Sequence, residues 1–189
     1  MGYEIRTVRA EDWAELRVLR LAALADPAAR VAFVDSYEMS SAQSDDFWRV
    51  RATPIAEGGA ATNVIAADEH GTWVAMLALL DETGVPVSSP LVAGGTGEDG
   101  AGGQPQMHVV SVYVRPEHRG TGAAEQLLRT AIVWTWENSK AERIRLWVHG
   151  DNPRAEAFYR RIGFVRTGGT MAFPPVPEET EYEMALQRP

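Results

Sequence analysis

A turn of small residues, between an apolar segment and an amphipathic one, is the first part of the chain that could do chemistry. It reads Arg119-Gly120-Thr121-Gly122-Ala123-Ala124. Glycine and alanine let a backbone come close to a ligand. The first N–H groups of a helix have no intrahelical partner and carry partial positive charge, so this turn predicts an anion site suited to phosphate. Arg119 would add a fixed charge and several hydrogen-bond donors.

Two other phosphate-binding patterns fit this turn less well. A P-loop requires a lysine followed by Ser or Thr after its last glycine, and no lysine follows here. The dinucleotide pattern Gly-x-Gly-x-x-Gly would begin at Gly120 and Gly122, but Glu125 stands at its third glycine. An ordinary helix N-terminus after a tight turn is the alternative to a binding site.

A second motif lies downstream, after one further helix and one further strand. The residues Asn152, Ala155, Tyr159, Gly163 and Phe164 follow the pattern Asn-x-x-Ala-x-x-x-Tyr-x-x-x-Gly-Phe. The earlier residues Arg119, Gly122 and Ala124 match Arg/Gln-x-x-Gly-x-Gly/Ala. With both motifs in this order, residues 107–164 resemble the GNAT N-acetyltransferase superfamily.

This resemblance implies a cofactor, acetyl-coenzyme A, and a place for it. Its diphosphate would bind the N–H groups from Gly120 to Ala124. Its pantetheine arm would enter between two splayed parallel strands, pair like a strand with Val112 and Val114, and contact Asn152. The residues expected around the cofactor are Val112, Tyr113, Val114, Arg119, Gly120, Thr121, Gly122, Ala123, Ala124, Asn152, Ala155 and Phe158.

Tyr159 and His108 are the expected catalytic residues. An alkylammonium group has a pKa of about 10.4, so a base must remove its proton before the amine attacks a thioester. His108 is the only usual base on strand 107–114, and a structural strand-end histidine is the alternative. A tyrosine hydroxyl can return a proton to the departing thiolate, and Tyr159 would point at the sulfur in this family. A core tyrosine is the alternative for Tyr159.

Three functions remain open at this point. The first is an N-acetyltransferase that moves acetyl to a primary amine by direct attack in a ternary complex. Direct attack is expected because the chain has no cysteine and no Gly-x-Ser-x-Gly nucleophile motif around Ser111. The second is a non-catalytic acyl-coenzyme A-binding module, favoured by the lack of Asp or Glu on strand 107–114. The third is a nucleotide-binding α/β protein.

The elements that must position these residues form a mixed α/β pattern. Strands are expected at 4–8, 63–67, 72–80, 107–114, 144–148, 164–167 and 180–186, and helices at 13–24, 44–51, 121–137 and 153–162. Pro174, Pro175 and Pro177 are expected to separate the last two strands. Residues 83–106 are rich in Gly and Pro and predict a flexible excursion within one domain, 1–189. With the resemblance, the expected fold is a mostly antiparallel twisted sheet with a central splayed parallel strand pair and helices on both faces.

Composition limits the partners. The net charge of -8 disfavours nucleic acid and leans toward a cationic small-molecule or peptide amine. There is no apolar run of about 18 residues, so no membrane span is expected. Without cysteine or histidines at metal spacing, no metal site is expected, and His70 and His149 are interpreted as structural. A cytoplasmic location is the default, and a homodimer is common in the family.

Overall fold

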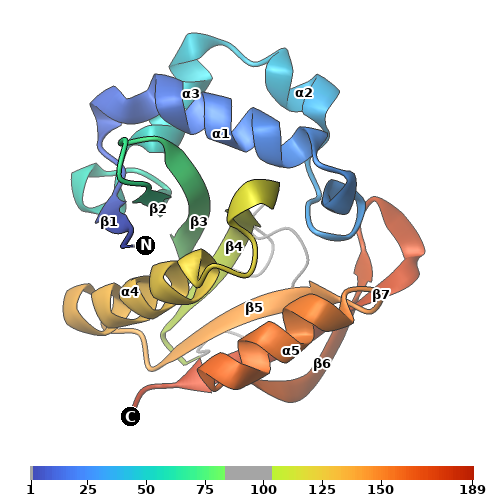
Figure 1. Cartoon of the computed structure of the whole chain (residues 1–189). Helices are drawn as coiled ribbons and strands as arrows, with labels where there is room; N and C mark the ends of the chain where they lie inside the picture. The colour runs from blue at the N-terminus through green and yellow to red at the C-terminus, as the bar shows by residue number, and fades with distance from the viewer. Residues whose placement is uncertain (1, 84–103) are drawn as a thin grey trace.

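The computed structural model describes residues 2–83 and 104–189, so most of the predicted excursion 83–106 lies outside the described residues. A seven-stranded sheet runs through the protein in the order β1-β2-β3-β4-β5-β7-β6 (Figure 1). Its strands are β1 (Glu4–Thr7), β2 (Ala61–Ala67), β3 (Trp73–Asp81), β4 (Gln106–Val114), β5 (Arg143–His149), β6 (Val165–Phe173) and β7 (Val176–Gln187). Every pairing is antiparallel except that of β4 with β5. The expected fold class is therefore confirmed.

Five α-helices accompany the sheet in the described residues. They are α1 (Trp13–Ala25), α2 (Tyr37–Ser41), α3 (Asp45–Ala52), α4 (Ala123–Asn138) and α5 (Pro153–Ile162), with short 3-10 turns at Ala10–Asp12, Pro27–Val31, Ile55–Glu57 and Pro116–His118. The predicted cap of α3 is present, because Ser44 Oγ accepts a hydrogen bond from the Phe47 N–H at 3.3 Å. Gly163 ends α5 in the left-handed region at φ = +116°, as its position after the helix predicts.

Each face of the sheet has its own core, because neighbouring strand residues point to opposite faces. Val64 of β2 lies in a cluster with Leu127 of α4, whereas Ile65 lies in a second cluster with Leu16 of α1. Figure 1 shows α1 and α3 on one side of the sheet and α4 and α5 on the other. The phosphate turn before α4 therefore lies on the side opposite α1.

The parallel pair β4 and β5 is joined over a short distance only. The register pairs Gln106 with Arg143, Met107 with Ile144 and His108 with Arg145, and no pair follows along the described strands. Beyond His108 the two strands separate, so the edge of β4 that faces β5 has unpaired backbone groups. The predicted splayed pair is present in the centre of the sheet.

Several boundaries differ from the sequence predictions, most of all those of the closing strands, expected at 164–167 and 180–186 and observed at Val165–Phe173 and Val176–Gln187. Two differences have a clear physical reason. The helix expected from residue 121 begins at Ala123, because Gly122 adopts φ = +90° and stands before the first helical residue. The prediction that Pro177 separates the closing strands was wrong, because Pro177 lies inside β7. The register of β7 with β5 begins only at Glu181, so Pro177 lies where β7 lacks that neighbour and a missing N–H is tolerated. No helix of the described residues is long and apolar enough to cross a membrane.

Candidate active site

A cavity of about 850 Å³ lies where β4 and β5 separate. On one side it is lined by the phosphate turn and by α5, including Gly120, Gly122 and Phe158. On the other side it is lined by residues of α1 and α3, Arg20 and Arg51. Because these helices cover opposite faces, the cavity passes through the sheet and can hold two molecules that meet between the strands.

The turn before α4 presents free backbone donors to this cavity. Gly120 and Gly122 adopt φ values of +80° and +90°, in the left-handed region that favours glycine. Within residues 2–83 and 104–189, no acceptor is present for the N–H groups from Gly120 to Glu125. Gln126 is the first residue of this stretch whose N–H bonds back, to the Gly122 carbonyl at 3.0 Å. These donors could bind an anion without losing any existing hydrogen bond.

Arg119 lines the cavity, and two of its three guanidinium nitrogens already bind other residues of the protein. Its Nη2 forms an ion pair with Asp26, and its Nε donates to the Val114 carbonyl at 3.1 Å. Asp26 in turn accepts from the Ala28 N–H at 2.9 Å. The guanidinium is therefore fixed in place, and its Nη1 makes no hydrogen bond to the part of the chain that the structure describes. The sequence did not point to Asp26 as its partner.

The second motif forms the start and one side of α5. Asn152 caps the helix, since its Oδ1 accepts from the Ala155 N–H at 3.1 Å. Its Nδ2 makes no hydrogen bond within the described residues. Asn152, Ala155 and Phe158 all line the cavity, as expected of residues around a cofactor. A capping role and a ligand contact are compatible for Asn152, because they use different side-chain atoms.

The cavity-facing part of β4 contains an irregularity at Ser111. Ser111 has φ = +58° and is the only non-glycine residue with positive φ among the described residues. The pairing of β4 with β3 shifts register between Val110 and Tyr113. A bulge of this kind leaves backbone groups unpaired, here beside the cavity. Val112, Tyr113 and Val114 follow it and line the cavity, with Tyr113 belonging to the core on the α1 side.

Tyr159 lies on α5 at the cavity wall and is 8% exposed. Its ring contacts Phe158 and Phe164, with ring centroids 5.4 Å and 6.0 Å away. Burial among these apolar groups raises the pKa of Tyr159 above its ordinary value, so the phenol keeps its proton at neutral pH. Tyr159 is thus both a core residue and a proton-bearing group of the cavity.

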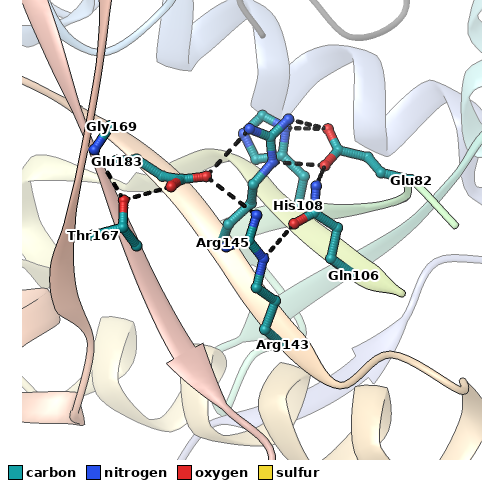
Figure 2. Close-up of polar contacts among 8 residues, drawn as sticks. All are labelled: Glu82, Gln106, His108, Arg143, Arg145, Thr167, Gly169 and Glu183. Atoms are coloured by element: carbon teal, nitrogen blue, oxygen red, sulfur yellow. Dashed lines mark hydrogen bonds and ion pairs between the residues drawn. The ribbon is translucent and has the colours of Figure 1, made fainter. Parts of the chain in front are cut away.

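His108 lies on the cavity wall at the last paired position of β4 (Figure 2). Its Nδ1 is 3.0 Å from Oε1 of Glu82, and Arg145 reaches both oxygens of the same carboxylate, at 2.6 and 2.7 Å. Burial alone would raise the pKa of Glu82, but its bonds with His108 and Arg145 lower it to about 2. Because Glu82 is ionised, Nδ1 of His108 must carry the hydrogen, and Nε2 of the neutral ring remains an acceptor.

The carboxylate of Glu82 belongs to a wider network of polar groups, drawn in Figure 2. Gln106 Nε2 donates to Glu82 at 2.8 Å, and Arg145 Nη1 donates to Glu183 at 3.4 Å. Thr167 also donates to Glu183. Such a network restricts the side chains that it contains, so His108 is held in one orientation.

Two further ionisable residues of β5 and β7 line the cavity. His149 is buried, and its Nδ1 accepts from the Asp151 N–H at 3.1 Å, so its Nε2 donates to Glu179 at 2.7 Å. Both nitrogens are used within the protein, which agrees with a structural role. Its neighbour across the strands, Glu181, makes no hydrogen bond or ion pair within the described residues. Burial raises the pKa of Glu181.

The structure brings together most but not all of the predicted site residues. Thr121 and Ala123 do not line the cavity with their side chains. Thr121 Oγ1 instead bonds with the Tyr3 hydroxyl at 2.7 Å, and Ala123 is buried in the core. Only their backbone N–H groups remain available for the predicted role.

Sequence reasoning missed several charged residues of the site, among them Arg20, Arg51, Glu82 and Glu181. A signal for Arg20 was present, because it interrupts the helical spacing of the buried residues Leu16 and Leu24. No local pattern marks Glu82, whose partners are far away along the chain. Among the described residues, no group of three or more His, Asp or Glu could hold a metal ion.

Comparison with known proteins places this geometry in a family. Residues 24–164 match the model described as the acetyltransferase (GNAT) family. A stretch of 87 residues, 43% of this chain, is 40% identical to a mycothiol acetyltransferase of Segniliparus rotundus, where it covers 30% of that protein. The chain spans less than half the length of the curated relatives that it matches.

Solved structures with the same fold cover almost the whole chain. A GCN5-related N-acetyltransferase from Kribbella flavida aligns over 98% of both chains with a TM-score of 0.66 and 18% identity. Arabidopsis thaliana NAA60, solved in complex with acetyl-CoA, aligns over 98% of both chains with a TM-score of 0.67 and 13% identity. At these identities the likeness is one of fold.

Proposed function

Because the chain belongs to the GNAT acetyltransferase family, we propose that it transfers acetyl from acetyl-coenzyme A to a primary amine of a small molecule or peptide, by direct attack in a ternary complex. The observation that carries the proposal is the cavity that passes through the sheet where β4 and β5 separate. A thioester on one side of the gap and an amine on the other could react there without a covalent enzyme intermediate.

Cofactor binding would use the backbone more than side chains. The N–H groups from Gly120 to Ala124 have no acceptor within the described residues and would bind the diphosphate, with Arg119 Nη1 nearby. The unpaired edge of β4 at Val112 and Val114 would pair with the amides of the pantetheine arm. Tyr113, Asn152, Ala155 and Phe158 would complete the walls. Bound acetyl-coenzyme A supplies an activated acyl group as a thioester.

His108 is the proposed base. The Nδ1–H bond to ionised Glu82 orients the ring and would stabilise the imidazolium that forms when Nε2 takes a proton from the ammonium. The non-catalytic module was favoured because β4 contains no Asp or Glu. The pairing of His108 with Glu82 weakens that reason, because it gives the histidine an acidic partner from another part of the chain. The acid is supplied by Glu82, directly after β3.

Backbone N–H groups beside the irregularity at Ser111 would stabilise the oxyanion formed by attack on the thioester carbonyl. Tyr159 is the proposed acid. Burial raises the pKa of Tyr159, so the phenol keeps its proton and can hydrogen-bond to the sulfur as negative charge develops there. The C–S bond breaks, and the sulfur leaves with the phenol proton. The new amide nitrogen loses its second proton, which restores the phenol of Tyr159, and His108 releases the first proton to solvent.

The test measures free thiol released from acetyl-coenzyme A across a library of primary amines. The proposal expects release that depends on the amine and on the enzyme. Thermal unfolding in the presence of coenzyme A, ATP or NAD separates the alternatives, since a ligand that binds only the folded state raises the melting temperature. Stabilisation by coenzyme A without thiol release from any amine would favour the non-catalytic module. Stabilisation by ATP or NAD alone would favour a nucleotide-binding protein.

A further inference from the structure

Two arginines, Arg20 of α1 and Arg51 of α3, line the cavity on the side of the sheet opposite the phosphate turn. If the cofactor binds at that turn, these arginines lie on the acceptor's side. Neither has a role in the proposed chemistry, and neither lies in a cofactor motif. The contacts and burial of these arginines indicate which charged group the acceptor contains.

Arg20 is 3% exposed and incompletely paired. Its Nη2 donates to Asp35 at 2.9 Å, and its guanidinium carbon lies 4.5 Å from the centre of the Phe33 ring. The atoms Nε and Nη1 are buried and have no hydrogen-bond partner among residues 2–83 and 104–189. Buried polar groups are nearly always paired, so two free donors on one buried guanidinium indicate a missing acceptor.

Arg51 adds a second positive charge at the same place. Its Nε is also buried without a partner, and its side chain makes no ion pair within the described residues. Burial lowers the pKa of Arg20 to about 10, and the nearby charge of Arg51 contributes to this shift, against the effect of Asp35. Both guanidinium groups are still protonated at neutral pH, so two cations share one carboxylate, Asp35.

An uncompensated buried charge destabilises a folded protein, and its retention is best explained by a ligand that neutralises it. Guanidinium groups bind carboxylates through paired, charge-assisted hydrogen bonds, for which Arg20 and Arg51 have free N–H donors. The ligand expected here is therefore an anion with acceptor oxygens.

We propose that Arg20 and Arg51 bind the carboxylate of the acceptor, which is a small molecule of the amino acid type. This inference rests on the proposed function, because it describes the amine that the acetyltransferase uses. The unpaired carboxylate of Glu181, in the same cavity, offers a contact for the ammonium end of such a zwitterion. The acceptor class then differs from the cationic amine that the net charge of -8 favours, because the local charge of the cavity outweighs the charge of the whole surface.

The first experiment compares L-amino acids with the matching amino acid amides as acceptors, by thiol release from acetyl-coenzyme A. The amides have less basic amines and so more free amine at neutral pH. A preference for the acids therefore cannot come from amine basicity. We expect kcat/KM to be at least about tenfold higher for the acids, as for loss of one charge-assisted hydrogen bond. Equal or better use of the amides would overturn the inference.

The second experiment replaces Arg51 with methionine, which is apolar and of similar length. We expect R51M to lose the preference for acids through a raised KM, with coenzyme A binding unchanged. Its melting temperature should equal or exceed that of the wild type, because an unpaired buried charge is removed. The control is R17M, on the same helix as Arg20, because Arg17 pairs with Asp45 and does not line the cavity. R17M should keep the preference, and its loss in both variants would count against the site.

A third measurement separates this inference from the proposed function. The probes are 4-methylvalerate and 3-phenylpropionate, carboxylates without an amine, added in the presence of coenzyme A, with thermal unfolding as the readout. Stabilisation of the wild type and not of R51M supports the anion site even if no amine is acetylated. If amines are acetylated without a preference for the acids, and neither carboxylate raises the melting temperature, the acetyltransferase function is supported and the anion site is rejected.

Discussion

Nδ1 of His108 and Oε1 of Glu82 lie 3.0 Å apart, although 26 positions separate these residues in the chain. The carboxylate is buried and is bound on both oxygens by Arg145. This arrangement fixes the orientation of the histidine: Nδ1–H faces the carboxylate, and the ring belongs to a residue that lines the cavity. The proposed role of His108 as a base therefore depends on Glu82 as well.

Replacing Glu82 with glutamine should lower kcat by roughly 10²-fold, in the range of general-base contributions. It should also move the acidic limb of the pH profile to lower pH, because the negative charge of Glu82, which interacts with His108, no longer favours the protonated form of the base. The measurement is the pH dependence of kcat/KM. The control is E183Q, which also removes a carboxylate from Arg145 but does not touch His108. An unchanged pH profile in E82Q, or an equal shift in E183Q, would contradict the positioning role.

Replacing Tyr159 with phenylalanine should reduce kcat by about 10²-fold while coenzyme A still raises the melting temperature. The ring packing with Phe158 and Phe164 is retained, so the free energy of unfolding should change little. Turnover is compared across the accessible pH range, with Y37F at an exposed tyrosine as the control. Wild-type turnover at every pH would exclude Tyr159 as the acid.

Replacing Gly120 with valine should abolish stabilisation by coenzyme A at concentrations that stabilise the wild type. Valine is strained at φ = +80°, and relief of this strain would turn the free N–H groups away from the cavity. Gly71, in the turn between β2 and β3, provides the matched control. It has φ = +78°, and, as at Gly120, no atom lies within 4 Å of a Cβ added there. G71V should lose a similar amount of stability, roughly 1–3 kcal/mol, and keep coenzyme A binding. Equal loss of binding in both variants would mean that strain alone is responsible.

Acid should weaken the fold through Glu82. The pKa of Glu82 is lowered from 4.5 to about 2 in the folded protein, so its contribution is present above pH 4.5 and is lost as the pH falls toward 2. The magnitude is of the order of 3 kcal/mol, from about 1.4 kcal/mol per pKa unit. Urea unfolding between pH 5 and pH 2.5 measures it, with E82Q as the comparison. If the wild type and E82Q lose stability in parallel over this range, the lowered pKa is contradicted.

The fold was largely predictable from local patterns. The alternation along β1, the apolar runs of β2 and β3 and the helical spacing in α1, α4 and α5 are short-range features that a chain carries in its residue order. Gly163 and Ser44 marked helix ends because their conformations and side-chain bonds are local. Pro177 was misread, since a proline is excluded only from strand positions with a bonded neighbour, and the neighbours are not visible in the sequence.

The residues of the site likewise fall into those that local sequence indicated and those that only the folded chain brought together. The phosphate turn from Arg119 to Ala124 was visible in the residue order, because backbone donors at a helix start depend on adjacent residues. The second motif and Tyr159 were indicated by the resemblance to the family. The partners of these groups depended on how distant strands and helices align, as with Glu82 beside His108. The unpaired charges of Arg20 and Arg51 also arise only in the folded chain, since burial and the absence of a counter-charge are properties of the tertiary structure. The sequence by itself thus determined the family and the cofactor motifs, whereas tertiary packing decided the orientation of the proposed base and the charge of the acceptor side.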